Sequence, residues 1–213
     1  MMEIVRYEEL AGLFEGVAAI FAEKKEELCE MDAKMGDGDL GLTMDKGYGS
    51  LPGLIRENGE AGDIGKSLMK AGMKMAGVVP STMGTLMSSG VMEGGKALKG
   101  KSEMGPWELS AYLTGFAAGI QKRWKCQLGD RTILDALDAG AKSAEKAAAA
   151  GKDLAGVIEA ACEGAAQGVE ATKEMTPKFG KAAVFAAKAI GTPDQGAVAG
   201  LYMLEGLKRS ICR

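Results

Sequence analysis

Apolar side chains recur every three or four residues along most of the chain, which is the spacing of one face of an α-helix. The longest such stretch starts at Leu10 and predicts one amphipathic helix that ends near Asp32. A second starts at Pro106, where proline suits the first helical turn because its missing N–H group would be unpaired there. The predicted buried stripe of this second helix consists of Leu109, Leu113, Phe116, Ile120 and Trp124.

Strong helix formers dominate three further segments, 132–150, 153–172 and 196–208. With the remaining apolar stretches, about eight helices are predicted, joined at breaks that contain glycine or proline. Alternating strand patterns are scarce, and only the neighbouring pair Val78 and Val79 is typical of a strand. The pattern predicts an all-α protein in which residues 1–213 form a single domain.

Composition narrows the class of protein. No apolar run approaches the roughly 20 residues that cross a bilayer, and the first residues lack the pattern of a secretory signal. The formal net charge is -3, whereas a nucleic-acid binder usually carries a basic stripe. We therefore expect a cytoplasmic protein that binds neither membranes nor nucleic acid. Its four cysteines form no CxxC pair and are expected to be small core residues.

The chain contains no histidine. This absence excludes Ser-His-Asp triads, Cys-His nucleophiles and HExxH zinc sites. Any chemistry must use carboxylates, lysines, hydroxyl groups, backbone amides or a bound metal.

Glycine is unusually frequent, at 32 of 213 residues. Each glycine inside a helix costs about 1 kcal/mol relative to alanine, so the excess needs a reason. Close helix–helix contact is expected to explain most of these glycines. The clusters at 36–41 and 191–196 differ, because acids accompany them at predicted helix boundaries, where bare backbone amides can bind phosphates.

The segment 32–44 reads Asp-Ala-Lys-Met-Gly-Asp-Gly-Asp-Leu-Gly-Leu-Thr-Met. Its glycines match the GxGxxG pattern, but a helix rather than a strand precedes them, and two acids would face the pyrophosphate of a dinucleotide. An EF-hand loop that starts at Asp37 would need glutamate at its twelfth position, where Tyr48 stands. Neither motif explains the segment.

A metal–phosphate site does explain it. Asp32, Asp37 and Asp39 would repel one another unless a cation lay between them, and magnesium prefers oxygen ligands. A helix that starts near Gly41 would direct its free N–H groups to the same place. A helix cap in a polar turn is the structural alternative, and this segment alone leaves both interpretations open.

Three blocks, in this order, resemble the L subunit of dihydroxyacetone kinases. The first is the segment 32–44, and the second is Gly-Asp-Arg-Thr-Ile-Leu-Asp at 129–135. The third runs from Gly-Lys-Ala-Ala at 180–183 to Ile-Gly-Thr-Pro-Asp-Gln-Gly-Ala at 190–197. Together they extend the resemblance over essentially the whole chain.

The resemblance implies an eight-helix antiparallel barrel that binds ADP or ATP at one end through two magnesium ions. It implies that Asp32, Asp37 and Asp39 are the metal ligands. Eleven further positions are implied to contact the nucleotide: Leu40, Gly41, Leu42, Thr43, Val78, Val79, Gly129, Lys181, Asp194, Gln195 and Gly196.

The chain also departs from the family's pattern. Leu40 and a position near Thr192 lack the usual histidines, and Gln195 stands where proline is expected. Lys181 replaces an arginine, which keeps the charge but loses the bidentate fork. The family's Gly-Gly-x-Ser-Gly-Pro segment corresponds to Ala-Gly-Val-Val-Pro-Ser at 76–81. These departures predict a divergent branch whose metal end is kept better than its contacts to the rest of the nucleotide.

In this family a separate K-type subunit or domain holds the ketose covalently through a histidine. The resemblance therefore implies the phosphoryl-donor half of a kinase for dihydroxyacetone or a related short ketose, which acts with a K-type partner. The donor is either exchanging ATP or a bound ADP that a phosphotransferase-system protein recharges. A non-catalytic nucleotide-sensing regulatory protein is the alternative. The oligomeric state is open, with a homodimer among the options.

Overall fold

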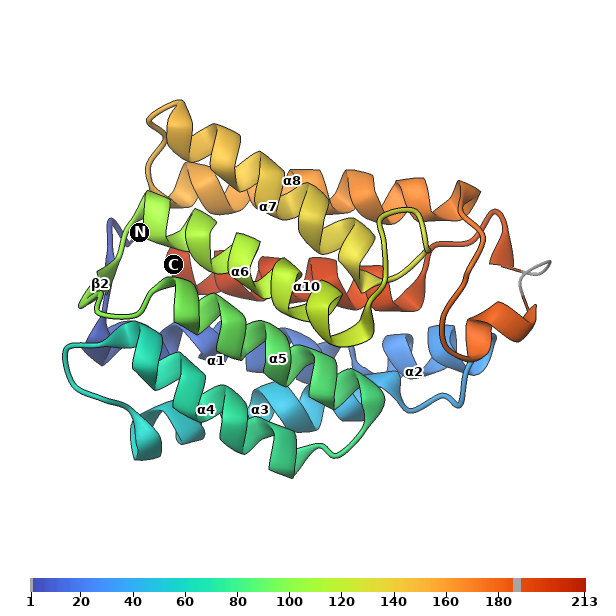
Figure 1. Cartoon of the computed structure of the whole chain (residues 1–213), viewed down its shortest axis with the longest axis horizontal. Coiled ribbons are helices and arrows are strands. Elements are labelled where there is room, and N and C mark those ends of the chain that lie inside the picture. The colour runs from blue at the N-terminus through green and yellow to red at the C-terminus, as the bar shows by residue number, and fades with distance from the viewer. Residues whose placement is uncertain (1, 186–188) are drawn as a thin grey trace.

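The computed structural model describes residues 2–185 and 189–213, and within these residues the chain is almost entirely helical (Figure 1). Its α-helices are α1 (Leu10–Glu23), α2 (Lys25–Ala33), α3 (Leu40–Asn58), α4 (Ile64–Val78), α5 (Thr82–Ala97), α6 (Pro106–Trp124), α7 (Ile133–Ala149), α8 (Leu154–Ala171) and α10 (Gln195–Ile211). Three short 3-10 helices are η1 (Tyr7–Glu9), η2 (Thr172–Glu174) and η3 (Lys181–Phe185). The prediction of an all-α protein is confirmed.

The helices form a closed ring. Successive members pack side by side in the order α1, α3, α4, α5, α6, α7, α8 and α10, and α10 returns to pack against α1. Both chain ends lie at one end of this ring, and the backbone N–H of Met2 donates to the carbonyl of Ile211 there. Because short connections join most neighbours, successive helices run antiparallel, and every second helix begins at the end away from the termini.

The first predicted helix is broken into two. Lys24 leaves the helical conformation, with φ -99° and ψ 6°, and separates α1 from α2. Hydrogen bonds from Lys24 N–H to Ile20 and from Leu28 N–H to Lys24 still span the break. One irregular residue therefore explains why the described residues hold nine α-helices although about eight were predicted from periodicity.

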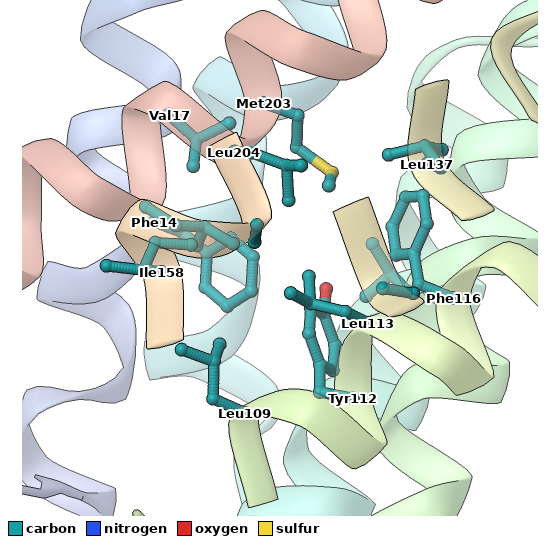
Figure 2. Packing of buried hydrophobic residues seen from close by; sticks show 14 of the residues in the cluster. Phe14, Val17, Leu109, Tyr112, Leu113, Phe116, Leu137, Ile158, Met203 and Leu204 are labelled. Atoms are coloured by element: carbon teal, nitrogen blue, oxygen red, sulfur yellow. The ribbon is translucent and has the colours of Figure 1, made fainter. Parts of the chain in front are cut away.

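Apolar side chains fill the inside of the ring (Figure 2). Phe14 of α1 meets Tyr112 of α6 edge to face, with ring centroids 6.2 Å apart. In the predicted stripe of α6, every member from Leu109 to Ile120 is buried, whereas Trp124 at its end is only partly buried. The barrel is thus a packed core rather than a channel.

Many glycines lie where two helices approach closely. A Cβ atom at Gly90 of α5 would stand 2.7 Å from the ring of Phe116, and one at Gly94 would stand 2.7 Å from the ring of Tyr112. Real Cβ atoms do not approach so closely, so α5 needs glycine at these two positions to pack against α6. The expectation that close packing accounts for much of the glycine is confirmed at these positions.

Two expectations were wrong in detail. Val78 and Val79 do not form a strand, because Val78 ends α4 and Val79 caps it. The described strands are instead β1 (Val5–Arg6) and β2 (Glu103–Met104). They form an antiparallel pair, and each is only two residues long, too short to show a periodic pattern.

The four cysteines are free, but only Cys126 and Cys162 are buried, whereas Cys29 and Cys212 are partly exposed. Within the described residues, no helix is long and apolar enough to cross a membrane.

Candidate metal–phosphate site

A pocket of about 260 Å³ opens at the end of the barrel away from the termini. Among the described α-helices, four begin at this pocket and contribute lining residues from their first turns, namely α3, α5, α7 and α10. Each helix N-terminus presents unpaired N–H groups and a partial positive charge of about half an elementary charge. Their convergence makes the pocket attractive to anions, phosphates included.

Three carboxylates meet at one side of this pocket. One oxygen from each of Asp32, Asp37 and Asp39 lies within 4.8 Å of the other two. Asp32 is buried, whereas Asp37 and Asp39 are exposed toward the pocket that they line. The cluster that the sequence predicted is therefore assembled in the fold.

Backbone geometry explains why these acids converge. Asp32 lies in the last turn of α2, and its Oδ2 accepts hydrogen bonds from the N–H groups of Gly38 (2.9 Å) and Asp39 (3.2 Å). Gly38 adopts a φ of 78°, a left-handed conformation that glycine allows without steric cost. The connection from α2 to α3 is thus folded back around the Asp32 carboxylate.

Asp39 is the N-cap residue of α3, yet its side chain accepts no capping hydrogen bond. Asp63, Asp153 and Asp194 occupy the same position in α4, α8 and α10, and each of them caps its helix. The Asp39 carboxylate instead joins the cluster. The N–H groups of Leu40, Gly41 and Leu42 precede the first intrahelical hydrogen bond of α3, from Thr43 N–H to Asp39.

The pKa values of Asp37 and Asp39 are shifted in opposite directions. The ammonium of Lys181 hydrogen-bonds to Asp37 and lowers the pKa of that carboxyl group. Partial burial and the charges of Asp37 and Asp32 raise the pKa of Asp39. The pKa of Lys181 is raised in turn, chiefly by its bond to Asp37. The negative charge of Asp39 is therefore disfavoured beside the other acids, and an added cation would relieve this repulsion.

Lys181 reaches the cluster from the far end of the chain. It opens η3, and its Nζ lies 2.8 Å from Oδ2 of Asp37. Both side chains are more than half exposed, so the ion pair by itself contributes little to stability. The negative charges of Asp39 and Asp32 also act on the Lys181 ammonium group.

Arg131 holds the loop that leads into α10. It is 2% exposed, and its φ of 59° is unusual for a residue other than glycine. Its Nε donates to the Thr172 carbonyl (3.1 Å), and its Nη2 donates to the carbonyls of Ala189 (3.1 Å) and Thr192 (3.0 Å). Its Nη1 lies 3.8 Å from Oδ1 of Asp194 and makes no hydrogen bond. Arg131 thereby fixes the start of α10 at the pocket.

Asp194 caps α10 by accepting the N–H of Ala197 at 2.8 Å. Burial raises the pKa of its carboxyl group to about 6, although the Ala197 N–H and the nearby Arg131 act against this rise. The next residue, Gln195, donates from Nε2 to Oδ1 of Asp32 at 3.3 Å. Its Oε1 is buried without a hydrogen-bond partner. An unpaired buried oxygen beside a carboxylate suits a cation or a water bound to one.

The donor set fits magnesium. It consists of carboxylate oxygens with an amide oxygen nearby, which are the hard ligands that magnesium and calcium take, and it includes no thiol or imidazole. The helix N-termini beside it are groups that attract anions such as phosphate.

The structure brings many of the predicted site residues to the pocket. Those that line it are Asp32, Asp37, Asp39, Leu40, Thr43, Lys181, Asp194, Gln195 and Gly196. Their roles in binding stay predictions, because position alone does not identify a ligand.

The other predicted residues are not among those that line the pocket. Gly41 packs against α2, where an added Cβ would collide with the Lys25 carbonyl oxygen, and Leu42 is 57% exposed. Gly129 is turned toward α7 and donates its N–H to Oδ1 of Asp135 at 2.6 Å. Val78 and Val79 do not line the pocket either, whereas Ser81, Thr82 and Met83 do.

Several lining residues were not assigned from the sequence. They include Ser81 and Thr82 at the start of α5, Thr132 and Arg131 before α7, and the aromatic pair Trp124 and Phe179, whose ring centroids are 5.3 Å apart. Ser81 carried a signal, because serine is one of the preferred N-cap residues of a helix. Trp124 stood at the end of an apolar stripe, which gave no reason to separate it from the core.

A closed antiparallel barrel of helices, with a cluster of three carboxylates beside a pocket where several helices begin, defines the class of this all-α protein. The chain belongs to the DAK2 domain family, which its residues 34–209 match.

Relatives of similar length are subunits of bacterial kinases. The chain is 28% identical to the "PEP-dependent dihydroxyacetone kinase 2, ADP-binding subunit DhaL" of Listeria innocua, over 99% of this chain and 100% of that protein. It is 26% identical to the "PEP-dependent dihydroxyacetone kinase, ADP-binding subunit DhaL" of Escherichia coli, over 88% and 89% of the two chains.

Longer relatives carry the same domain as one part. The chain is 27% identical to human "Triokinase/FMN cyclase" over 93% of its own length but only 34% of that protein. The solved structure of the dihydroxyacetone kinase from C. freundii in complex with AMP-PNP and Mg2+ superposes with a TM-score of 0.69 at 25% identity. That match covers 94% of this chain and 33% of the kinase, so the chain spans about a third of these longer proteins.

Proposed function

We propose that this chain is the magnesium-dependent, ADP- or ATP-binding phosphoryl-donor subunit of a kinase for dihydroxyacetone or a related short ketose. The observation that carries the proposal is the convergence of Asp32, Asp37 and Asp39 within 4.8 Å, beside a pocket where four helices begin. Oxygen ligands on one side and helix N-termini on the other suit a metal-bound diphosphate or triphosphate.

The chain's own residues would divide the work. The three aspartates would hold the metal, for which we infer two ions, and the N–H groups at the start of α3 would bind phosphate oxygens. Arg131 and Asp194 would keep the first turn of α10 in place against the pocket. Bound magnesium would neutralise charge on the transferring phosphoryl group. The ammonium of Lys181 would add a further positive charge near the phosphates.

The acceptor is proposed to be held by a separate K-type subunit. The chain contains no histidine that could trap a ketose covalently. It matches the Listeria innocua ADP-binding subunit over that subunit's full length, but only a third of the C. freundii kinase. The additional two thirds of the longer protein leave room for acceptor binding outside the region that this chain resembles.

The phosphoryl donor is proposed to be ATP that forms in place when a bound ADP is phosphorylated, and that returns to ADP on transfer. The two relatives of similar length are described as PEP-dependent and as ADP-binding subunits, which supports this choice over exchanging ATP. A phosphotransferase-system protein would then be a second partner.

Two measurements test the proposal. Calorimetric titration of ADP should show binding in magnesium and loss of binding in chelator. A bacterial K-type subunit mixed with this chain should then form dihydroxyacetone phosphate, either with ATP or with phosphoenolpyruvate and phosphotransferase-system proteins. Absence of magnesium-dependent ADP binding would refute the proposal. Binding without turnover under both donor conditions would favour the nucleotide-sensing regulatory protein instead.

A further inference from the structure

Lys181 occupies a particular position in the carboxylate cluster. Among the described residues, it is the only lysine or arginine that pairs with one of the three clustered acids, through the 2.8 Å contact between its Nζ and Oδ2 of Asp37. It also lines the pocket that Asp32 and Asp39 line. Its ammonium group therefore already provides one positive charge where the proposed metal would bring two.

An ammonium group and a divalent cation compete for the same position beside the three carboxylates. Binding of a bare cation sets two positive charges side by side, or forces the ammonium away from Asp37 into solvent. A cation that arrives with phosphates brings its own negative charges, with which the displaced ammonium can pair. The same lysine thus opposes the bare metal and tolerates the metal–nucleotide complex.

We infer that Lys181 is a built-in counter-ion of the three aspartates, which makes cation binding at this site conditional on a phosphate ligand. The inference rests on the proposed function and adds a specificity-determining residue to it. The flexible stem of lysine suits this role, because its ammonium group is a compact point charge that can move between two partners. Lys181 would pair with Asp37 in the free protein and with phosphate oxygens in the complex.

The test compares three variants in two titrations. Lys181→Met removes the charge and keeps most of the apolar stem, whereas Lys181→Arg keeps the charge. Lys178→Met is the matched control, because Lys178 lies three residues away, is 64% exposed and pairs with Asp130 at 2.7 Å, outside the pocket lining. Each protein is freed of nucleotide and metal with chelator, then titrated calorimetrically with magnesium chloride alone at low ionic strength. A second titration adds ADP at saturating magnesium.

For magnesium alone, Lys181→Met should bind roughly three- to tenfold tighter than wild type, since a neighbouring positive charge is removed from a partly exposed site. Lys181→Arg and Lys178→Met should match wild type. For ADP with magnesium, Lys181→Met should bind roughly tenfold weaker, because a partner of the phosphates is lost. In melting experiments, magnesium alone should stabilise Lys181→Met more than wild type.

Opposite signs in the two titrations are the signature of a counter-ion. Magnesium affinity in Lys181→Met that equals or falls below that of wild type, or that stays unmeasurable, would overturn the inference. The proposed function fails by a different result, namely no magnesium-dependent ADP binding by the wild-type protein. The titration with magnesium alone still decides the role of Lys181 in that case.

Discussion

The side-chain amide of Gln195 donates to Oδ1 of Asp32 at 3.3 Å, joining the first turn of α10 to the last turn of α2 across 163 positions of sequence. An ionised carboxylate only accepts hydrogen bonds, so the amide nitrogen must face Asp32, and Oε1 is left buried without a partner. Gln195 thus connects α10 to α2 beside the pocket, while its own Oε1 stays without a hydrogen-bond partner.

Gln195→Pro should leave the fold intact and raise stability by up to about 1 kcal/mol. Gln195 is the first residue of α10, where proline is accommodated, and Asp194 before it is extended, with φ -69° and ψ 128°. The change removes the unpaired oxygen and restricts the unfolded chain. Urea unfolding measures the effect, with Gln195→Ala as the control for losing the amide alone. A loss above about 1 kcal/mol would show that the bond to Asp32 matters more than the buried oxygen.

Asp39→Asn should abolish most of the magnesium-dependent ADP binding and, in the metal-free protein, raise stability. Its pKa is raised by burial and by the neighbouring acids, which means that its negative charge is unfavourable in the folded state. Asp37→Asn should lose ADP binding similarly but gain no stability, because its charge is paired with Lys181.

Calorimetric ADP titration and thermal melts in chelator separate these effects. Asp45→Asn is the control, since Asp45 is also in α3 but pairs with Lys25 at 3.2 Å outside the cluster. Unchanged ADP affinity in both cluster variants would remove the metal assignment. A merely structural loop would instead lose about 1 kcal/mol of stability with no effect on ADP.

Asp194 should make stability fall as the pH rises. Its folded pKa of about 6 lies above the value of about 3.9 for a free aspartate, so the folded protein binds the proton more tightly. Its favourable contribution is fully present below pH ~4 and is lost as the pH rises through ~6. The shift of about two pKa units corresponds to a loss of about 3 kcal/mol in the free energy of unfolding.

Urea unfolding of wild type and Asp194→Asn between pH 4 and 7 measures this contribution. The variant cannot titrate at this position, so its stability relative to wild type should improve steadily across the range. Asp153→Asn controls for the capping bond, because Asp153 caps α8 at an exposed position. A difference between wild type and Asp194→Asn that does not vary with pH would contradict the expectation.

Gly41→Ala should destabilise the protein by about 2 kcal/mol or more, as overpacking does. The added Cβ would collide with the Lys25 carbonyl oxygen and lie 2.9 Å from the Sγ of Cys29. Gly49→Ala in the same helix meets nothing within 4 Å and should stabilise by about 0.5–1 kcal/mol. Denaturant unfolding of the pair isolates the packing effect from helix propensity. Equal effects would mean that α2 can move away from α3 without cost.

Periodicity and local signals determined much of this protein from the sequence alone. The helical pattern fixed the fold class, because each amphipathic stripe must be buried against another helix. Asp32, Asp37 and Asp39 could be singled out because they are within eight positions of one another, flanking a glycine turn. Local spacing brings such residues together whatever the rest of the chain does.

Tertiary structure decided everything that depends on distant segments meeting. Gly41 looked like part of a phosphate loop, yet the approach of α2 to α3 is what requires glycine there. Gln195 reaches Asp32, and Arg131 holds the carbonyls of Thr172, Ala189 and Thr192, only because the ring of helices closes with α10 beside α1. Periodicity specifies which face of a helix is buried but not which neighbour buries it. The pocket, which draws on the ends of several helices, therefore exists only in the closed barrel.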